Sequence, residues 1–200
     1  MSSPAASQFL NFLERGRTLA ERARDRRIRP IGRKEAGVYL HAALATYVAS
    51  WDSYTKMLSA AFFTETADPG LLKFSALHDL LSSLHRGAIK KLNTPNSDNV
   101  RTFLVSYTGY DPIGDWIWPE RSMNGLIVRQ RLDEILKVRH SFAHGIAMPA
   151  YGLNTTASGD VRLTFEIVKY TEKFLVNLVT RTDNGMKQHI LLTYDAAHSW

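Results

Sequence analysis

Near the end of one amphipathic segment lie three side chains suited to phosphate chemistry without a metal, those of Arg139, His140 and His144. An arginine guanidinium is planar and always charged, so it can contact a phosphate through two N–H groups. An unperturbed histidine titrates at about pH 6.5, so it can take or give a proton near neutrality. Cleavage of RNA by its own 2′-hydroxyl needs one group to remove a proton, another to supply one, and a cation. These three side chains are therefore candidates for a site that acts on a phosphodiester.

On one straight helix, Arg139 and His144 would not lie side by side. Five residues turn a helix by about 500°, which leaves the two roughly 140° apart, whereas His140 and His144 are only about 40° apart. Either the long arginine side chain wraps round the helix, or a two-fold axis lets each chain's arginine meet the other chain's histidine. The second arrangement supplies one histidine for each proton step. His140 could orient His144 or contact substrate, the alternative being a solvated surface histidine.

Two residues of an earlier segment are candidates for a supporting role. Asp52 lies beside the apolar stripe of its segment and could hold Arg139 or His144 by a charge-assisted hydrogen bond. The alternative is an exposed helix carboxylate. Tyr54 lies on the stripe itself, so a place in the core is more expected for it than stacking on a base.

Neither a metal nor a cofactor is expected. His140 and His144 have the spacing of a zinc pair, but no third ligand follows nearby. The chain has no cysteine, which excludes disulfides, thiolate metal sites and cysteine nucleophiles. It also has no glycine-rich phosphate loop and no His-Glu-x-x-His or Gly-x-Ser-x-Gly motif.

The net charge of +6 is concentrated in one stretch of the chain. Residues 14–34 carry nine basic and three acidic side chains, whereas the other residues carry sixteen of each sign. This pattern is typical of a contact surface for nucleic acid or an acidic partner, although a solvated helix face with biased charge explains it equally well. The candidate RNA contacts are Arg22, Arg26, Arg29, Arg33 and Lys34.

Length and composition indicate an ordinary globular chain. The 200 residues are 44% hydrophobic and 22% charged, which is enough apolar material for one sizeable core. No apolar run approaches the roughly 18 residues that a membrane-spanning helix needs, and residues 1–8 lack the pattern of a signal peptide. We therefore expect a cytoplasmic protein with no membrane segment.

Apolar periodicity predicts an all-α bundle, with helices over residues 9–29, 35–63, 71–92, 100–107, 126–144 and 161–180. In the helix over 126–144, Phe142 is expected to face the core and Gly145 to end the helix. The sequence Asp183-Asn184-Gly185 is a turn signal, so the tail could form a hairpin. The expected organisation is a basic N-terminal helical segment (1–34), a helical bundle (35–182) and a C-terminal extension (183–200).

The string VRHSFAHG at residues 138–145 resembles the signature of HEPN domains, an arginine, then a polar residue, then a histidine, as it occurs in the RiboL-PSP-HEPN subgroup. The string ASWDSY at 49–54 and the string NTPN at 93–96, followed by Val100 and Phe103, are similar to that subgroup as well. The resemblance covers about residues 36–180. It implies an antiparallel helical bundle that commonly dimerises, and a metal-independent endoribonuclease, often of a toxin–antitoxin or anti-phage system.

Two classes of function follow. The first is a dimeric endoribonuclease with a composite site, which acts on RNA through Arg139 and His144, leaves a 2′,3′-cyclic phosphate, and has an antitoxin or a defence protein as a further partner. The alternative is a helical module without catalytic activity, which binds RNA or an acidic partner protein through residues 14–34.

Overall fold

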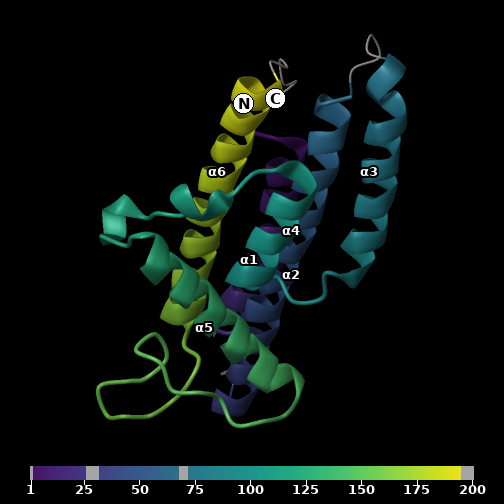
Figure 1. Ribbon diagram of the computed structural model, residues 1–200. Helices are drawn as coiled ribbons and strands as arrows, with labels where there is room; N and C mark the ends of the chain where they lie inside the picture. The colour runs from purple at the N-terminus through teal and green to yellow at the C-terminus, as the bar shows by residue number, and fades with distance from the viewer. Residues whose placement is uncertain (1, 26–31, 68–71, 195–200) are drawn as a thin grey trace.

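The computed structural model describes residues 2–25, 32–67 and 72–194, and within these ranges the chain is an all-α bundle (Figure 1). The expected fold class is confirmed. The regular elements are α1 (Pro4–Arg22), α2 (Arg33–Glu65), α3 (Leu72–Lys91), α4 (Ser97–Thr108), α5 (Gly125–Ala143) and α6 (Phe165–Tyr194), with short 3₁₀ turns at Pro112–Gly114 and Pro119–Arg121. The described residues form no strand, and only two isolated bridges, Trp118 with Met123 and Thr155 with Val161, pair extended backbone.

The long helix α2 is the centre of the core and contacts α1, α3, α4, α5 and α6. Trp51, in the middle of α2, is completely buried and donates its indole N–H to the carbonyl of Pro95 over 2.9 Å. Tyr54, one turn later, is also buried and donates its hydroxyl to the carbonyl of Val179 on α6 over 3.2 Å. These two hydrogen bonds satisfy the polar ends of large aromatic side chains, which is what allows them to fill a core.

Helix α1 belongs to the same core. It begins after Ser3, whose hydroxyl accepts a hydrogen bond from the N–H of Ala6, and Pro4 occupies the first turn. Phe9 and Leu13 are fully buried between α2 and α6. The helix therefore starts and ends earlier than the residues 9–29 that periodicity predicted.

The expected hairpin in the tail is wrong over the described residues, because α6 runs without interruption through the Asp183-Asn184-Gly185 sequence to Tyr194. Asp183 is buried and accepts hydrogen bonds from the backbone N–H and the hydroxyl of Ser3. Gly185 lies where the helix passes Tyr110, so that a Cβ there would come within 2.0 Å of the tyrosine oxygen. Both residues thus serve helix packing rather than a turn.

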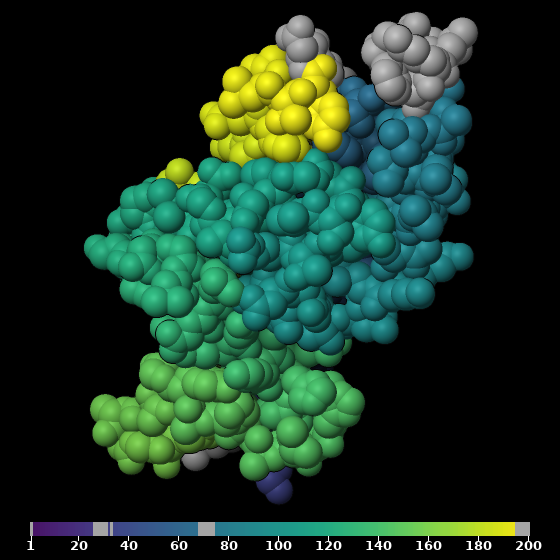
Figure 2. All heavy atoms as spheres, in the orientation of Figure 1, coloured from purple at the N-terminus to yellow at the C-terminus, as the bar shows by residue number. Residues whose placement is uncertain are grey.

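One end of the bundle gathers the ends of four helices. Figure 1 shows the end of α5 at the bottom of the molecule, near the starts of α2 and α6 and the end of α1. The ring of Phe142 on α5 stacks on that of His41 on α2, and the guanidinium of Arg24, after α1, lies 4.3 Å from the ring of Phe165 on α6. The residues after α5 form a protruding green lobe at this end (Figure 2). In the described part of the chain, no helix is both long and apolar enough to cross a bilayer.

Candidate functional site

The C-terminal turn of α5 ends in a defined cap that leaves His144 at the rim. Gly145 has a φ of 63°, and its N–H donates to the carbonyl of Phe142 over 3.3 Å. The N–H of Ile146 donates to the carbonyl of Ser141 over 3.0 Å, which completes a Schellman motif. Because glycine adopts this left-handed conformation without strain, the chain turns away directly after His144. The predicted stop at Gly145 is therefore confirmed, and the imidazole of His144 is exposed.

Arg139 lies on the apolar stripe of α5, one turn after Ile135 and Leu136, which are both buried. Its side chain is half-buried, and its Nε atom is inaccessible to solvent and has no hydrogen-bond partner. Within the described ranges, no carboxylate forms an ion pair with this guanidinium. The Nε atoms of Arg129 and Arg131 on the same helix also lack hydrogen-bond partners, but these two side chains form ion pairs with Asp98 and Glu134, at 2.6 and 3.0 Å. No described carboxylate therefore offsets the charge of Arg139.

His140 and His144 come together as their spacing predicts. Their ring centroids are 4.1 Å apart with an angle of 38° between the ring planes. Both side chains are exposed, and neither ring forms a hydrogen bond with the described residues. Two exposed imidazoles thus lie on one side of the end of α5.

Arg139 and His144 lie on different sides of that helix. Because α5 is regular through Ala143, the expected separation of roughly 140° around its axis applies. Arg139 continues the stripe that faces the bundle, whereas His144 faces solvent. A single chain therefore does not present the two side chains side by side on one helix face, and the pairing of Arg139 with a second chain's His144 stays a prediction.

Phe142, expected in the core, has 46% of its surface exposed. One face of its ring stacks on His41 with the centroids 4.3 Å apart and the planes only 4° from parallel. His41 is half-buried, and burial lowers the pKa of its imidazole. Sequence reasoning missed this pair, because the contact depends on where α2 crosses α5 and no local pattern reports that.

Of the two supporting candidates on α2, Asp52 pairs with a lysine of its own helix and Tyr54 is buried in the core. The Oδ2 atom of Asp52 accepts from Lys56 at 2.7 Å, and its Oδ1 atom is buried without a partner. The structure gives Asp52 no hydrogen bond to Arg139 or His144, so a role in holding either one stays a prediction. Tyr54 is buried as expected, and burial raises its pKa well above the usual value. Its ring has no exposed face for a base.

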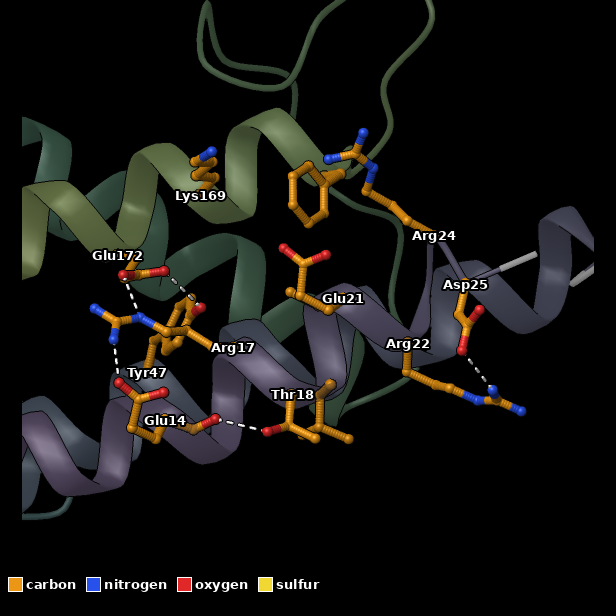
Figure 3. A pocket seen from close by; sticks show the side chains of 13 residues that line it. Glu14, Arg17, Thr18, Glu21, Arg22, Arg24, Asp25, Tyr47, Lys169 and Glu172 are labelled. Atoms are coloured by element: carbon orange, nitrogen blue, oxygen red, sulfur yellow. Dashed lines mark hydrogen bonds and ion pairs between the residues drawn. The ribbon is translucent and has the colours of Figure 1, made fainter. Parts of the chain in front are cut away.

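The basic segment lines a pocket of about 1100 Å³ between α1, Tyr47 and the first turns of α6 (Figure 3). Figure 3 shows Arg17 between Glu14 and Glu172, and Arg22 beside Asp25. The Arg22–Asp25 ion pair has a length of 3.3 Å. The pocket is lined by four cationic and four acidic side chains, so their formal charges cancel. This pocket does not supply the net positive charge that an RNA backbone requires.

The other proposed RNA contacts are only partly described. Arg26 and Arg29 lie outside the described residues. Arg33 begins α2, but its side chain is not described, and Lys34 is exposed. The described residues also contain no group of three or more His, Asp or Glu side chains that could hold a metal ion.

The sequence comparison identifies the family. The model of the RiboL-PSP-HEPN family matches residues 19–188, which is most of the chain. The protein therefore belongs to the RiboL-PSP-HEPN family of HEPN domains. No curated protein and no solved structure matches it. Membership supports a nuclease-type function directed at RNA, and the matched region includes both Arg139 and His144.

Proposed function

We propose that this protein is a metal-independent endoribonuclease in which Arg139 and His144 carry the reaction. The observation that supports this most is the guanidinium of Arg139, which lies on a core stripe, half-buried, without a carboxylate partner in the described chain. A buried N–H donor without an acceptor costs stability, and an anion bound beside Arg139 would supply the acceptor that its Nε atom lacks. A phosphodiester is the anion that fits an RNA-directed family.

The reaction can be written with the groups at the end of α5. The 2′-oxygen of a ribose attacks the adjacent phosphorus, the bond from phosphorus to the 5′-oxygen breaks, and a 2′,3′-cyclic phosphate forms. One imidazole removes the 2′-hydroxyl proton and a second protonates the departing 5′-oxygen. The N–H groups of Arg139 donate to the non-bridging oxygens as their charge increases. Because the nucleophile belongs to the substrate, few protein groups are needed.

A second copy of the chain completes this arrangement. The separation around α5 prevents Arg139 and His144 from meeting on one helix face, and a two-fold axis beside the helix end would bring each Arg139 to the other chain's His144. Such a dimer contributes two His144 side chains, one for each proton step. His140, with its ring centroid 4.1 Å from that of His144, then orients the catalytic imidazole or contacts the substrate.

The biological role proposed with this activity is that of a toxin or an anti-phage effector. An endoribonuclease with no metal requirement is active wherever RNA is accessible, so a cell must restrain it with a partner such as an antitoxin. We expect expression without such a partner to arrest growth, and the His144→Ala variant to be tolerated.

The test is an assay on purified protein with total RNA in the presence of EDTA. Wild type is compared with Arg139→Ala, His144→Ala and the control Lys137→Ala, which removes an exposed cation of the same helix. We expect cleavage by wild type and by the Lys137 variant, with cyclic phosphate ends, and a loss of about 10²–10⁴-fold in the other two. Equal cleavage by all four proteins, or ends with a free 3′-hydroxyl, would contradict the proposal.

A further inference from the structure

Phe142 is an aromatic side chain whose exposure the proposed reaction does not explain. The residue is 46% exposed although it follows the buried residues Ile135 and Val138 at helical spacing on α5. One ring face is covered by His41, with a 4.3 Å separation and nearly parallel planes. The exposed surface therefore includes the opposite face, so the ring is a flat apolar surface fixed from behind.

The ring of Phe142 is held from behind by the imidazole of His41, which is packed and uncharged. His41 is half-buried on α2, and its Nδ1 atom is inaccessible to solvent without a hydrogen-bond partner. Burial lowers its pKa below the ordinary value, so the imidazole is neutral at pH 7. Two neutral rings stacked in parallel hold the phenyl group in one orientation, which lowers the entropic cost of stacking a third ring on it.

Phe142 is also next to the proposed phosphate contact. It follows Arg139 by three residues, and residues at this spacing on a helix have Cβ atoms about 5–6 Å apart on the same side. This distance resembles the span from a nucleotide's phosphate to its base. A nucleotide whose phosphate contacts Arg139 can therefore place its base on the open face of Phe142.

We propose that Phe142, backed by His41, is the stacking platform for an unpaired base beside the phosphate held by Arg139, and that the substrate is single-stranded RNA. This inference rests on the proposed function. In a duplex, the bases are stacked on each other and paired, so no base face is free for Phe142. Every base has an aromatic face, so the platform selects for single strands rather than for a particular sequence.

The test measures binding separately from cleavage. Fluorescently labelled 12-nucleotide strands of A, U or C with 2′-fluoro sugars cannot be cut by internal attack, and the A and U strands also form a duplex. Their affinities are measured by anisotropy for wild type, Phe142→Leu, Phe142→Tyr and the control Leu126→Ala, which changes an exposed residue in the first turn of α5. Phe142→Leu keeps an apolar side chain at the position but removes the aromatic face.

We expect Phe142→Leu to bind single strands about 5- to 150-fold more weakly than wild type, since base stacking on an aromatic side chain contributes about 1–3 kcal/mol per base. Phe142→Tyr and Leu126→Ala should bind within two-fold of wild type. The duplex should bind weakly and with the same affinity to all four proteins.

Three results would overturn the inference. These are wild-type affinity in Phe142→Leu, an equal loss for duplex and single strands, and dissociation of a dimer by Phe142→Leu in sedimentation, which would assign the ring to a protein interface. The inference and the proposed function fail separately. If Phe142→Leu weakens binding but wild type cuts no RNA, only the proposed nuclease activity is refuted. If wild type cuts RNA but Phe142→Leu binds as wild type does, only the stacking role of Phe142 is refuted.

Discussion

Arg139 occupies a position where an apolar side chain would stabilise the fold more than a guanidinium does. A buried N–H group without an acceptor costs about 1–3 kcal/mol. We therefore expect Arg139→Met to raise the free energy of unfolding by about 1 kcal/mol, because methionine fills the same stripe without an unpaired donor. Urea denaturation followed by circular dichroism measures this, and the same variant should have lost RNA cleavage.

Arg131→Met is the matched control on the same helix. Arg131 pairs with Glu134 at 3.0 Å, and the Glu134 side chain is only 12% exposed. Removing this arginine leaves a buried carboxylate without its cation, so the variant should be less stable than wild type. If Arg139→Met is also less stable, the guanidinium of Arg139 contributes to the fold, and its assignment to an external anion loses its support.

For single residues, helical spacing correctly predicted which side chains lie close together on one helix. It did not predict burial that depends on contacts between helices. The proximity of His140 and His144 follows from a four-residue step, and the ring distance of 4.1 Å agrees with it. Phe142 falls on the apolar stripe, yet the stripe extends past the part of α5 that the bundle covers. No sequence pattern shows where that cover ends.

Among the elements, the contact of α1 with α2 depends on the absence of a side chain at Gly16. A Cβ at this position would lie 2.3 Å from the Cε1 atom of Tyr47, whose ring is buried. We therefore expect Gly16→Ala to lower the free energy of unfolding by about 1–3 kcal/mol, since overpacking moves buried side chains from their places. Alanine would otherwise stabilise a helix interior by about 1 kcal/mol.

Gly87→Ala on α3 is the control, because a glycine-to-alanine change without overpacking should raise the free energy of unfolding instead of lowering it. Gly87 is exposed and a Cβ there meets nothing within 4 Å, so the variant should be more stable than wild type by about 0.5–1 kcal/mol. Thermal unfolding followed by calorimetry compares the two substitutions. A rise in stability for both would show that α1 does not pack on α2 as described.

Helix α3 is attached to the bundle through a buried histidine. The Nε2 atom of His85 lies 2.8 Å from the hydroxyl of Ser59 on α2, and its ring lies 4.8 Å from that of Phe63. Burial, with a smaller effect from Arg86, lowers the pKa of His85 to about 4. The unfolded chain then binds a proton between about pH 6.5 and pH 4 that the folded chain does not.

Acidification from pH 7.5 to pH 5 should therefore destabilise the protein through His85 by about 2 kcal/mol. The penalty is absent above pH 6.5 and complete below pH 4. His85→Gln keeps a polar partner for Ser59 but does not titrate, so urea denaturation at both pH values should show a smaller loss in the variant. Equal losses in both proteins would show that His85 is not buried as a neutral ring.

The helices themselves were largely predictable, and the error in the tail has a clear origin. The Asp183-Asn184-Gly185 sequence is a strong turn signal, but buried residues continue through it at helical spacing, with Leu178, Thr182, Met186 and Ile190 on one side. Periodicity over a long stretch was the better indicator here. The contacts of Asp183 with Ser3 and of Gly185 with Tyr110 are long-range, so no local signal could explain why these residue types occur.

For the whole molecule, the proposed two-fold arrangement makes a prediction about mixed dimers. Chains carrying Arg139→Ala and chains carrying His144→Ala are expressed together and the mixed dimer is purified with two tags. In this dimer the intact arginine and the intact histidine belong to different chains. The single remaining His144 can serve only one of the two proton steps, so the mixed dimer should cut more slowly than wild type. We expect its cleavage rate still to exceed that of either parent dimer by at least about tenfold, because one cross-chain pair is restored.

The mixed dimer of wild type with the double variant Arg139→Ala/His144→Ala has the same number of intact residues, but both belong to one chain. It should remain as inactive as the parent dimers. Higher activity in this second mixture, or full activity in a protein that sediments as a monomer, would show that each chain cuts RNA alone.

The sequence alone could not predict which helix ends lie together at the end of the bundle that carries Arg139 and His144. The motif at the end of α5 and the basic residues around the end of α1 are more than a hundred positions apart, yet both lie at the same end of the bundle (Figure 1). Helix lengths and crossing positions bring them there. The sequence also could not show that Glu172, which is 155 positions from Arg17, offsets the charge of that arginine.

The most direct test of the proposed chemistry uses a short RNA containing one mapped cleavage site. It is compared, in EDTA, with the same RNA carrying a single 2′-deoxy nucleotide on the 5′ side of the cleaved bond. We expect wild type to cut only the all-ribose strand and to leave a 2′,3′-cyclic phosphate, and His144→Ala to cut neither. Cleavage of the deoxy-substituted strand at the same bond, or wild-type cleavage by the His144 variant, would contradict the mechanism.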